Sequence, residues 1–133
     1  MDKITVIVEK AEDGTFWCHT SDALNGHICL TGCGETVAEA KADLHDCLQE
    51  VRDDARNHGE AICEVEFEWT YDLESFFNYF SFLNISAIAQ LAGINPSLMR
   101  QYASGAKKAG EKTYKRLSAC VDNIAKELAA ASF

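Results

Sequence analysis

A stop and restart of helical structure at residues 93–96 constrains the fold of this 133-residue chain more than any other feature. Gly93 follows an apolar run, Ile85 to Ala92, and glycine favours the left-handed conformation that ends many helices. Asn95 is a good cap for a second helix, and Pro96 suits its first position. Residues 85–108 are therefore predicted to form two helices joined by a turn of three residues, followed by a basic loop.

Helical spacing divides the second of these helices into an inner and an outer face. Met99 and Tyr102 point inward in this arrangement. The outer face and the basic loop predict a helix-turn-helix that lays its second helix in the major groove of DNA. The candidate DNA-binding residues are Pro96, Ser97, Arg100, Gln101, Ser104, Lys107 and Lys108. Ser97, Arg100 and Gln101 are expected at base edges, and the two lysines at phosphates. An ordinary corner between two helices of a bundle is the alternative.

Charge is divided unevenly along the chain. The net charge is -9, but residues 1–71 hold 5 basic against 16 acidic residues, whereas residues 72–133 hold 7 against 5. An acidic module attracts a basic partner and repels nucleic acid, while a weakly basic one can contact phosphates. Two domains are therefore predicted, covering residues 1–71 and 72–133.

The first domain is predicted to contain three strands, a helix and a fourth strand. The expected strands cover Lys3–Glu9, Phe16–Thr20, His27–Gly32 and Ala61–Trp69. A helix is expected over Thr36–Arg56, because Thr36 and Glu39 form a capping-box pattern and apolar residues follow at steps of three and four. The order β-β-β-α-β results.

The second domain is predicted to be all-α, which makes the whole chain α+β. Besides the central pair, helices are expected over Leu73–Leu83, with Asp72 as its cap, and over Lys112–Ala130. The first has more aromatic residues than one face can bury, which leaves Tyr79 or Phe82 for another surface. The apolar stripe of the last helix either seals the domain or pairs across a two-fold axis. A homodimer or higher homo-oligomer is expected.

The six cysteines are expected to be reduced, because the chain shows neither a signal peptide nor a membrane-spanning run and can build a core without disulfides. A cytoplasmic location follows. His27, Cys29 and Cys33 share one face of a strand if that segment is extended, but they lack the usual spacing of zinc ligands. No metal and no cofactor are expected.

Three stretches of the chain carry a resemblance to a known family. They are KITVIVEKAEDGTFWCH and GCGETVAEAKADLHDCLQ in the first module and INPSLMRQYASGAKKAGEKT in the second. In this order the two modules resemble the HicB family of type II antitoxins, in the branch with a C-terminal helix-turn-helix. This resemblance implies a degenerate, partly RNase H-like fold for the first module and a small basic HicA-type RNA-cleaving toxin as its partner. It also implies that the second module binds operator DNA and represses transcription of the shared operon.

Three functions remain open at this point. The first is an antitoxin and autorepressor, and the second is an orphan transcriptional regulator whose first domain oligomerises or senses a ligand. The third, a metal-dependent nuclease, requires several carboxylates that converge from strands and a helix on two Mg²⁺ ions. The first predicted strand offers Glu9 only at its end. We therefore expect no enzymatic activity.

Overall fold

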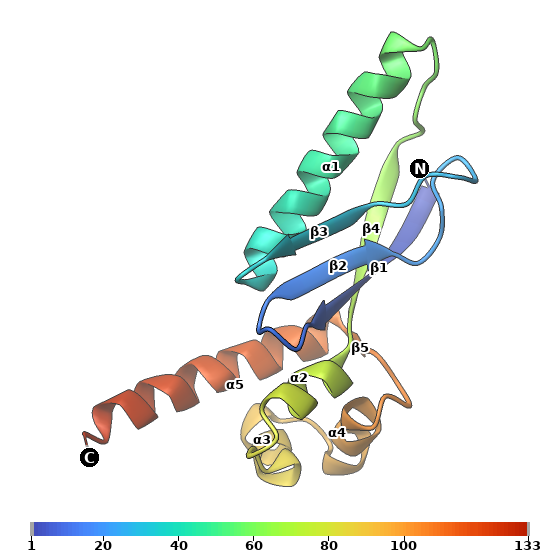
Figure 1. Cartoon of the computed structure of the whole chain (residues 1–133). Coiled ribbons are helices and arrows are strands. Elements are labelled where there is room, and N and C mark those ends of the chain that lie inside the picture. The colour runs from blue at the N-terminus through green and yellow to red at the C-terminus, as the bar shows by residue number, and fades with distance from the viewer. Residues whose placement is uncertain (1, 133) are drawn as a thin grey trace. The chain divides into compact units, whose positions relative to one another are not determined.

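The computed structural model describes residues 2–132, which form a mixed α+β structure (Figure 1). The chain divides into two compact units, of which the first ends at Thr70 and the second begins at Tyr71. Within residues 2–132, the first unit carries most of the sheet and one long helix, and the second carries four helices.

The described residues form a sheet of five strands in the order β3-β2-β1-β4-β5. The strands are β1 (Asp2–Lys10), β2 (Phe16–Thr20), β3 (Thr31–Gly34), β4 (Val65–Tyr71) and β5 (Ala109–Gly110). The pairs β1–β2 and β2–β3 are antiparallel. Asp2 N–H donates to the Glu64 carbonyl over 3.1 Å, and Thr70 Oγ1 donates to the Val6 carbonyl over 3.3 Å. Residue numbers rise together along β1 and β4, so these two strands run parallel.

The third strand lies later in the chain than predicted. It covers Thr31–Gly34 rather than His27–Gly32, because a tight turn occupies the preceding residues. Asn25 and Gly26 have φ angles of 49° and 78°, and Leu24 and Ile28 form an isolated antiparallel bridge across them. Asn-Gly favours a turn that needs two positive φ angles. Because the chain turns at these two residues, the third strand begins later than predicted.

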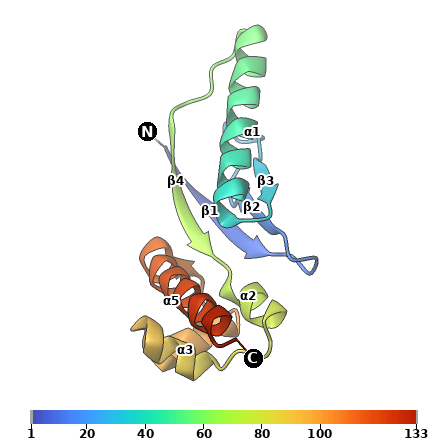
Figure 2. The same ribbon diagram turned by 90° about the vertical axis from the view of Figure 1, so that its left-hand side faces the viewer.

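Helix α1 (Val37–Asn57) covers one face of the sheet and packs on β2 and β3 (Figures 1 and 2). Thr36 caps it as predicted, since its side chain accepts the Glu39 N–H, while Glu39 accepts the N–H of Glu35. A Cβ at Gly32 would collide with backbone atoms of Ala40 and Leu44. The glycine therefore lets helix and strand approach closely.

Strand β4 begins four residues later than the predicted strand and continues to Tyr71. Its predicted alternation is confirmed. Glu66 and Glu68 are exposed, whereas Val65, Phe67 and Trp69 are half-buried.

In its described part the second unit contains four helices and the short strand β5. The prediction of an all-α domain therefore missed this strand. The helices are α2 (Leu73–Tyr79), α3 (Ile85–Ala92), α4 (Pro96–Ala103) and α5 (Glu111–Ala130). Asp72 caps α2, but that helix ends before Phe80 rather than at Leu83. The core of the unit includes Phe77 and Leu117.

Candidate nucleic-acid interface

The turn between α3 and α4 has the local geometry that its residues predict. Gly93 ends α3 with φ of 72°, and its N–H bonds back to the carbonyls of Ala89 and Gln90. Arg116 of α5 donates to the Gly93 carbonyl over 3.4 Å. The exposed carbonyl at the end of α3 thereby gains a partner, which holds the turn against the last helix.

Helix α4 is capped by a side chain from within the turn. Asn95 Oδ1 accepts the N–H of Ser97 over 2.9 Å and that of Leu98 over 3.2 Å. Pro96 takes the first helical position, where its missing N–H and fixed φ carry no penalty. The start of α4 is thus defined by two neighbouring residues.

The faces of α4 are separated as predicted. Met99 is fully buried and Tyr102 is 8% exposed, and both join Ile88 and Ala89 of α3 in the core. Most of the candidate DNA-binding residues are exposed, and Pro96 is half-buried. The exposed ones are Ser97, Arg100, Gln101, Ser104, Lys107 and Lys108. Residues 97, 100, 101 and 104 lie at helical spacing, so they form one polar surface.

Arg100 is held by hydroxyls from both helices. Its Nη1 donates to Ser86 Oγ of α3 over 3.1 Å, and its Nη2 donates to Ser97 Oγ of α4 over 3.1 Å. Two such bonds restrict a long side chain that is otherwise mobile at a surface. Ser86 was not predicted to belong to the site. It lies 14 positions before Arg100, and no local pattern joins the two.

The basic loop after α4 is folded back on the helix. Ser104 N–H bonds to the Arg100 carbonyl over 3.0 Å, and Lys107 N–H bonds to the Gln101 carbonyl over 3.3 Å. Gly105 has φ of 83°, and a Cβ there would collide with the Glu74 carboxylate of α2. The left-handed conformation at this position favours glycine, whereas the Glu74 carboxylate lies at the end of a flexible side chain that can move away from an added Cβ. The loop therefore presents both lysines from a defined backbone.

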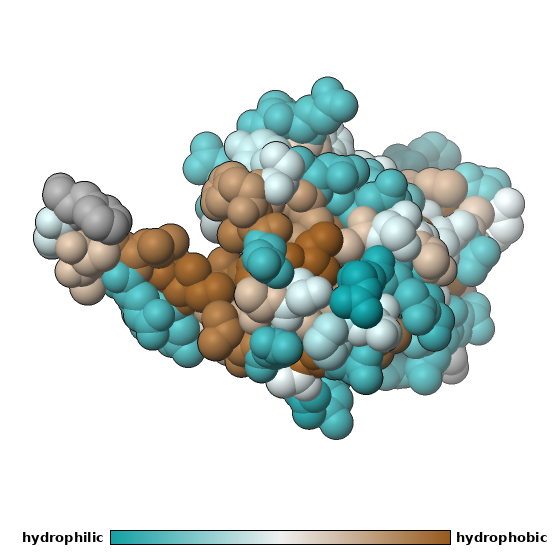
Figure 3. Space-filling model, turned by 90° about the horizontal axis from the view of Figure 1, so that it is seen from below, coloured by the Kyte–Doolittle hydropathy of each residue, from teal (hydrophilic) through white to brown (hydrophobic). Residues whose placement is uncertain are grey.

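The second unit also exposes large apolar side chains. Phe82 is 81% exposed, Leu91 is 71% exposed and Leu128 is 67% exposed. Figure 3 shows apolar side chains gathered along one side of α5 as it leads to the C-terminus. Exposed apolar surface of this kind often marks a protein-protein contact.

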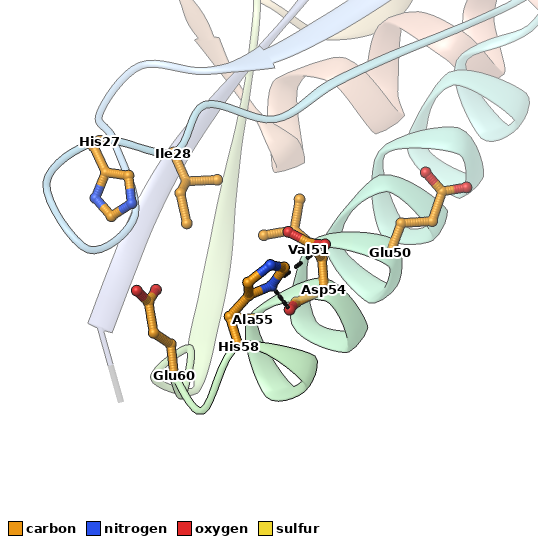
Figure 4. Close-up of a pocket in the computed structure, with 8 residues that line it drawn as sticks. All are labelled: His27, Ile28, Glu50, Val51, Asp54, Ala55, His58 and Glu60. Carbon is orange, nitrogen blue, oxygen red and sulfur yellow. Dashed lines mark hydrogen bonds and ion pairs between the residues drawn. The ribbon is translucent and has the colours of Figure 1, made fainter.

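A cavity of about 540 Å³ lies in the first unit, between α1 and the turn that precedes β3 (Figure 4). Its lining comprises His27, Ile28, Glu50, Val51, Asp54, Ala55, His58 and Glu60. Figure 4 shows His58 against Asp54, whose backbone carbonyl is 2.8 Å from Nδ1. This contact, with the nearby carboxylate, raises the pKa of His58. The carboxylates of the lining suit a cationic side chain more than an anion.

Within residues 2–132, no group of three or more His, Cys, Asp or Glu side chains is placed to hold a metal ion. All six cysteines are free. In the same described stretch, no helix is both long and apolar enough to cross a membrane.

Comparison with known proteins gives one informative similarity. The chain is 39% identical over 54 residues to a UPF0150 protein of Synechocystis sp., a match that covers 39% of this chain and 67% of that protein. No model of a protein family matches the chain. No solved structure matches it either.

Proposed function

This chain belongs to the UPF0150 family of HicB-like antitoxins, and on that premise we propose that it neutralises a toxin and represses its own operon. The toxin is a small basic RNA-cleaving protein of the HicA type, bound by the acidic first unit. The second unit binds operator DNA through α3, the turn and α4. The chain itself catalyses no reaction in this proposal.

The polar surface of α4 is the observation that carries the DNA-binding part. In a helix-turn-helix, the second helix enters the major groove and presents its outer residues to base edges. Arg100 and Gln101 suit guanine and adenine respectively. Because Ser86 and Ser97 already hold the Arg100 guanidinium, less side-chain entropy is lost when it meets a base.

The toxin-binding part is supported by the division of charge. The first unit is strongly acidic, with 16 acidic against 5 basic residues, whereas the second unit is weakly basic. A toxin that binds RNA needs a positive surface, so opposite charges would speed and orient its association with this unit.

A homodimer is part of the proposal. Palindromic operators are bound by paired helix-turn-helix units whose half-sites lie about one turn of DNA apart. The exposed Leu128 and the apolar side of α5 offer surface for such pairing.

Replacement of Arg100 by Ala tests the DNA-binding part. We expect the variant to lose roughly 5- to 150-fold in affinity for DNA from upstream of its own gene, equivalent to about 1–3 kcal/mol for one bidentate base contact. Fluorescence anisotropy with labelled duplex measures this loss. Lys126→Ala is the matched control, since it removes one exposed positive charge from α5. Equal losses in the two variants would show that only net charge matters.

Co-purification tests the antitoxin part. The full chain is co-expressed with the small basic protein encoded beside its gene, and we expect a stable complex in which the toxin no longer cleaves RNA. Arg100→Ala should form this complex unchanged. Specific DNA binding without any such complex would instead identify an orphan regulator.

A further inference from the structure

The outer edge of β4 lacks a neighbouring strand along most of its length. Its neighbours in the sheet are β1 and β5, and β5 has only two residues. The hydroxyl of Tyr71 donates to Glu111 Oε2 over 2.6 Å, beside the end of β5. This bond places β5 at the C-terminal end of β4. Figure 2 shows the first part of β4 at the margin of the first unit. In the described chain, residues 65–67 therefore have a strand on one side only.

The register identifies which backbone groups face this open edge. The Glu64 carbonyl accepts from Asp2 of β1, and backbone groups alternate in direction along a strand. Even-numbered residues of β4 therefore point their N–H and C=O groups toward β1. Val65 and Phe67 point theirs outward, where an added strand can bond to them.

The opposite edge of the sheet is formed by β3, and there a side chain already occupies the backbone donor. Cys33 of β3 points its N–H away from β2 and donates it to Asp43 Oδ2 of α1 over 3.0 Å. This carboxylate occupies the donor that an incoming strand would need. For residues 2–132, no comparable side-chain cap is found at Val65 or Phe67. Among the described strands, the edge of β4 is therefore the one open to strand addition.

An aromatic cluster holds β4 in place from one face. The ring centroids of Phe67 and Trp69 are 5.6 Å apart, and His45 of α1 lies 5.4 Å and 6.0 Å from them. Lys41 Nζ is 4.6 Å from the Trp69 centroid. The edge is thereby ordered before a partner arrives, which lowers the entropy lost on binding.

The charged side chains beside this edge of β4 determine which kind of strand can pair with it. Glu66 and Glu68 are exposed on the other face of β4. In an antiparallel pair of two β4 strands centred on Phe67, Glu66 of one copy would face Glu68 of the other, and like charges in that position destabilise pairing. A strand with Lys or Arg at alternate positions would instead form opposite-charge pairs.

We propose that the open edge of β4 is the docking site for an extended segment of the basic partner, which adds to the sheet as a strand bearing Lys or Arg. This inference rests on the proposed antitoxin function and names the surface that the partner contacts. Backbone bonds to Val65 and Phe67 supply the attachment, and the two glutamates supply the preference for a basic segment.

Amide hydrogen exchange, resolved by residue with NMR, tests the proposal on the full chain with and without the small basic protein encoded beside its gene. In the complex we expect exchange at Val65 and Phe67 to slow at least about tenfold. Glu66 and Glu68, which already bond toward β1, should change little. A stable complex without slowing at Val65 and Phe67 would overturn the docking edge but leave the antitoxin proposal standing. Failure to form any complex would overturn both.

A charge-reversal pair gives a second measurement. We expect Glu66→Lys/Glu68→Lys to weaken binding of the basic protein at least about tenfold. Glu12→Lys/Asp22→Lys changes the net charge equally at exposed turn residues and should weaken binding much less. Equal weakening would mean that attraction depends on net charge alone and would contradict docking at β4.

Discussion

At the scale of single residues, Cys18 shows how burial alters a side chain's chemistry. It is fully buried in β2, and its Sγ donates to the Ala40 carbonyl over 3.2 Å. Burial, as the largest cause, raises the pKa of the Cys18 thiol from 9.0 to about 11. A buried thiolate would lack solvation, so the folded chain keeps the proton that the unfolded chain releases.

This difference predicts a loss of stability at alkaline pH. Between pH 9 and 11 the unfolded state binds fewer protons than the folded state, so the free energy of unfolding falls as pH rises. The contribution of Cys18 is about 2 kcal/mol at the upper end. Urea unfolding at a series of pH values measures it. Cys18→Ala should show a weaker decline over this range, and parallel declines in both proteins would refute the assignment.

At the scale of elements, the turn between α3 and α4 depends on backbone conformation rather than on space. Gly93 has φ of 72°, yet an added Cβ would meet nothing within 4 Å. The restriction is therefore the left-handed backbone itself, which glycine adopts freely and asparagine tolerates better than alanine. Asn95 then starts α4 only two residues later.

We predict that Gly93→Ala lowers the free energy of unfolding by about 1–2 kcal/mol, because an alanine is strained at this φ. Gly93→Asn should recover part of that loss. Urea unfolding followed by circular dichroism compares the two variants with the unaltered chain. If alanine were tolerated as well as asparagine, steric or hydrogen-bonding effects elsewhere would have to explain the glycine.

At the scale of the whole molecule, the net charge of -9 is the sum of a strongly acidic first unit and a weakly basic second unit. An acidic chain gains little from general attraction to DNA, so the proposed DNA binding requires local phosphate contacts. Lys107 and Lys108 follow α4 and are both exposed. They are the proposed phosphate contacts beside the polar surface of α4.

The salt dependence of DNA binding should report on these two lysines. Each phosphate contact contributes about 0.9 to the slope of log affinity against log salt concentration. Lys107→Ala/Lys108→Ala is therefore expected to reduce that slope by about 2 per bound chain. Anisotropy titrations at several NaCl concentrations measure it. An unchanged slope would place the phosphate contacts elsewhere, and binding of the basic partner serves as the control for folding.

The sequence by itself determined the features that depend on neighbouring residues. Caps at Thr36 and Asn95, the end of α3 at Gly93 and the alternation of Glu66 and Glu68 in β4 all arise from contacts within a few positions. The spacing of residues in the sequence reveals these features because both interacting residues lie within a few positions of each other. The third strand was misplaced because the turn at Asn25-Gly26 holds Ile28 in a bridge with Leu24, so the paired strand begins only at Thr31.

Only the tertiary structure decided which distant residues meet. The Ser86 hydroxyl that holds Arg100, the Asp43 carboxylate that closes the β3 edge and the backbone that requires Gly32 each join separate elements. No periodicity links such pairs, because helix packing and strand order bring them together after the elements form. The polar surface of α4 was therefore predictable, whereas its support from α3 and the open edge of β4 were not.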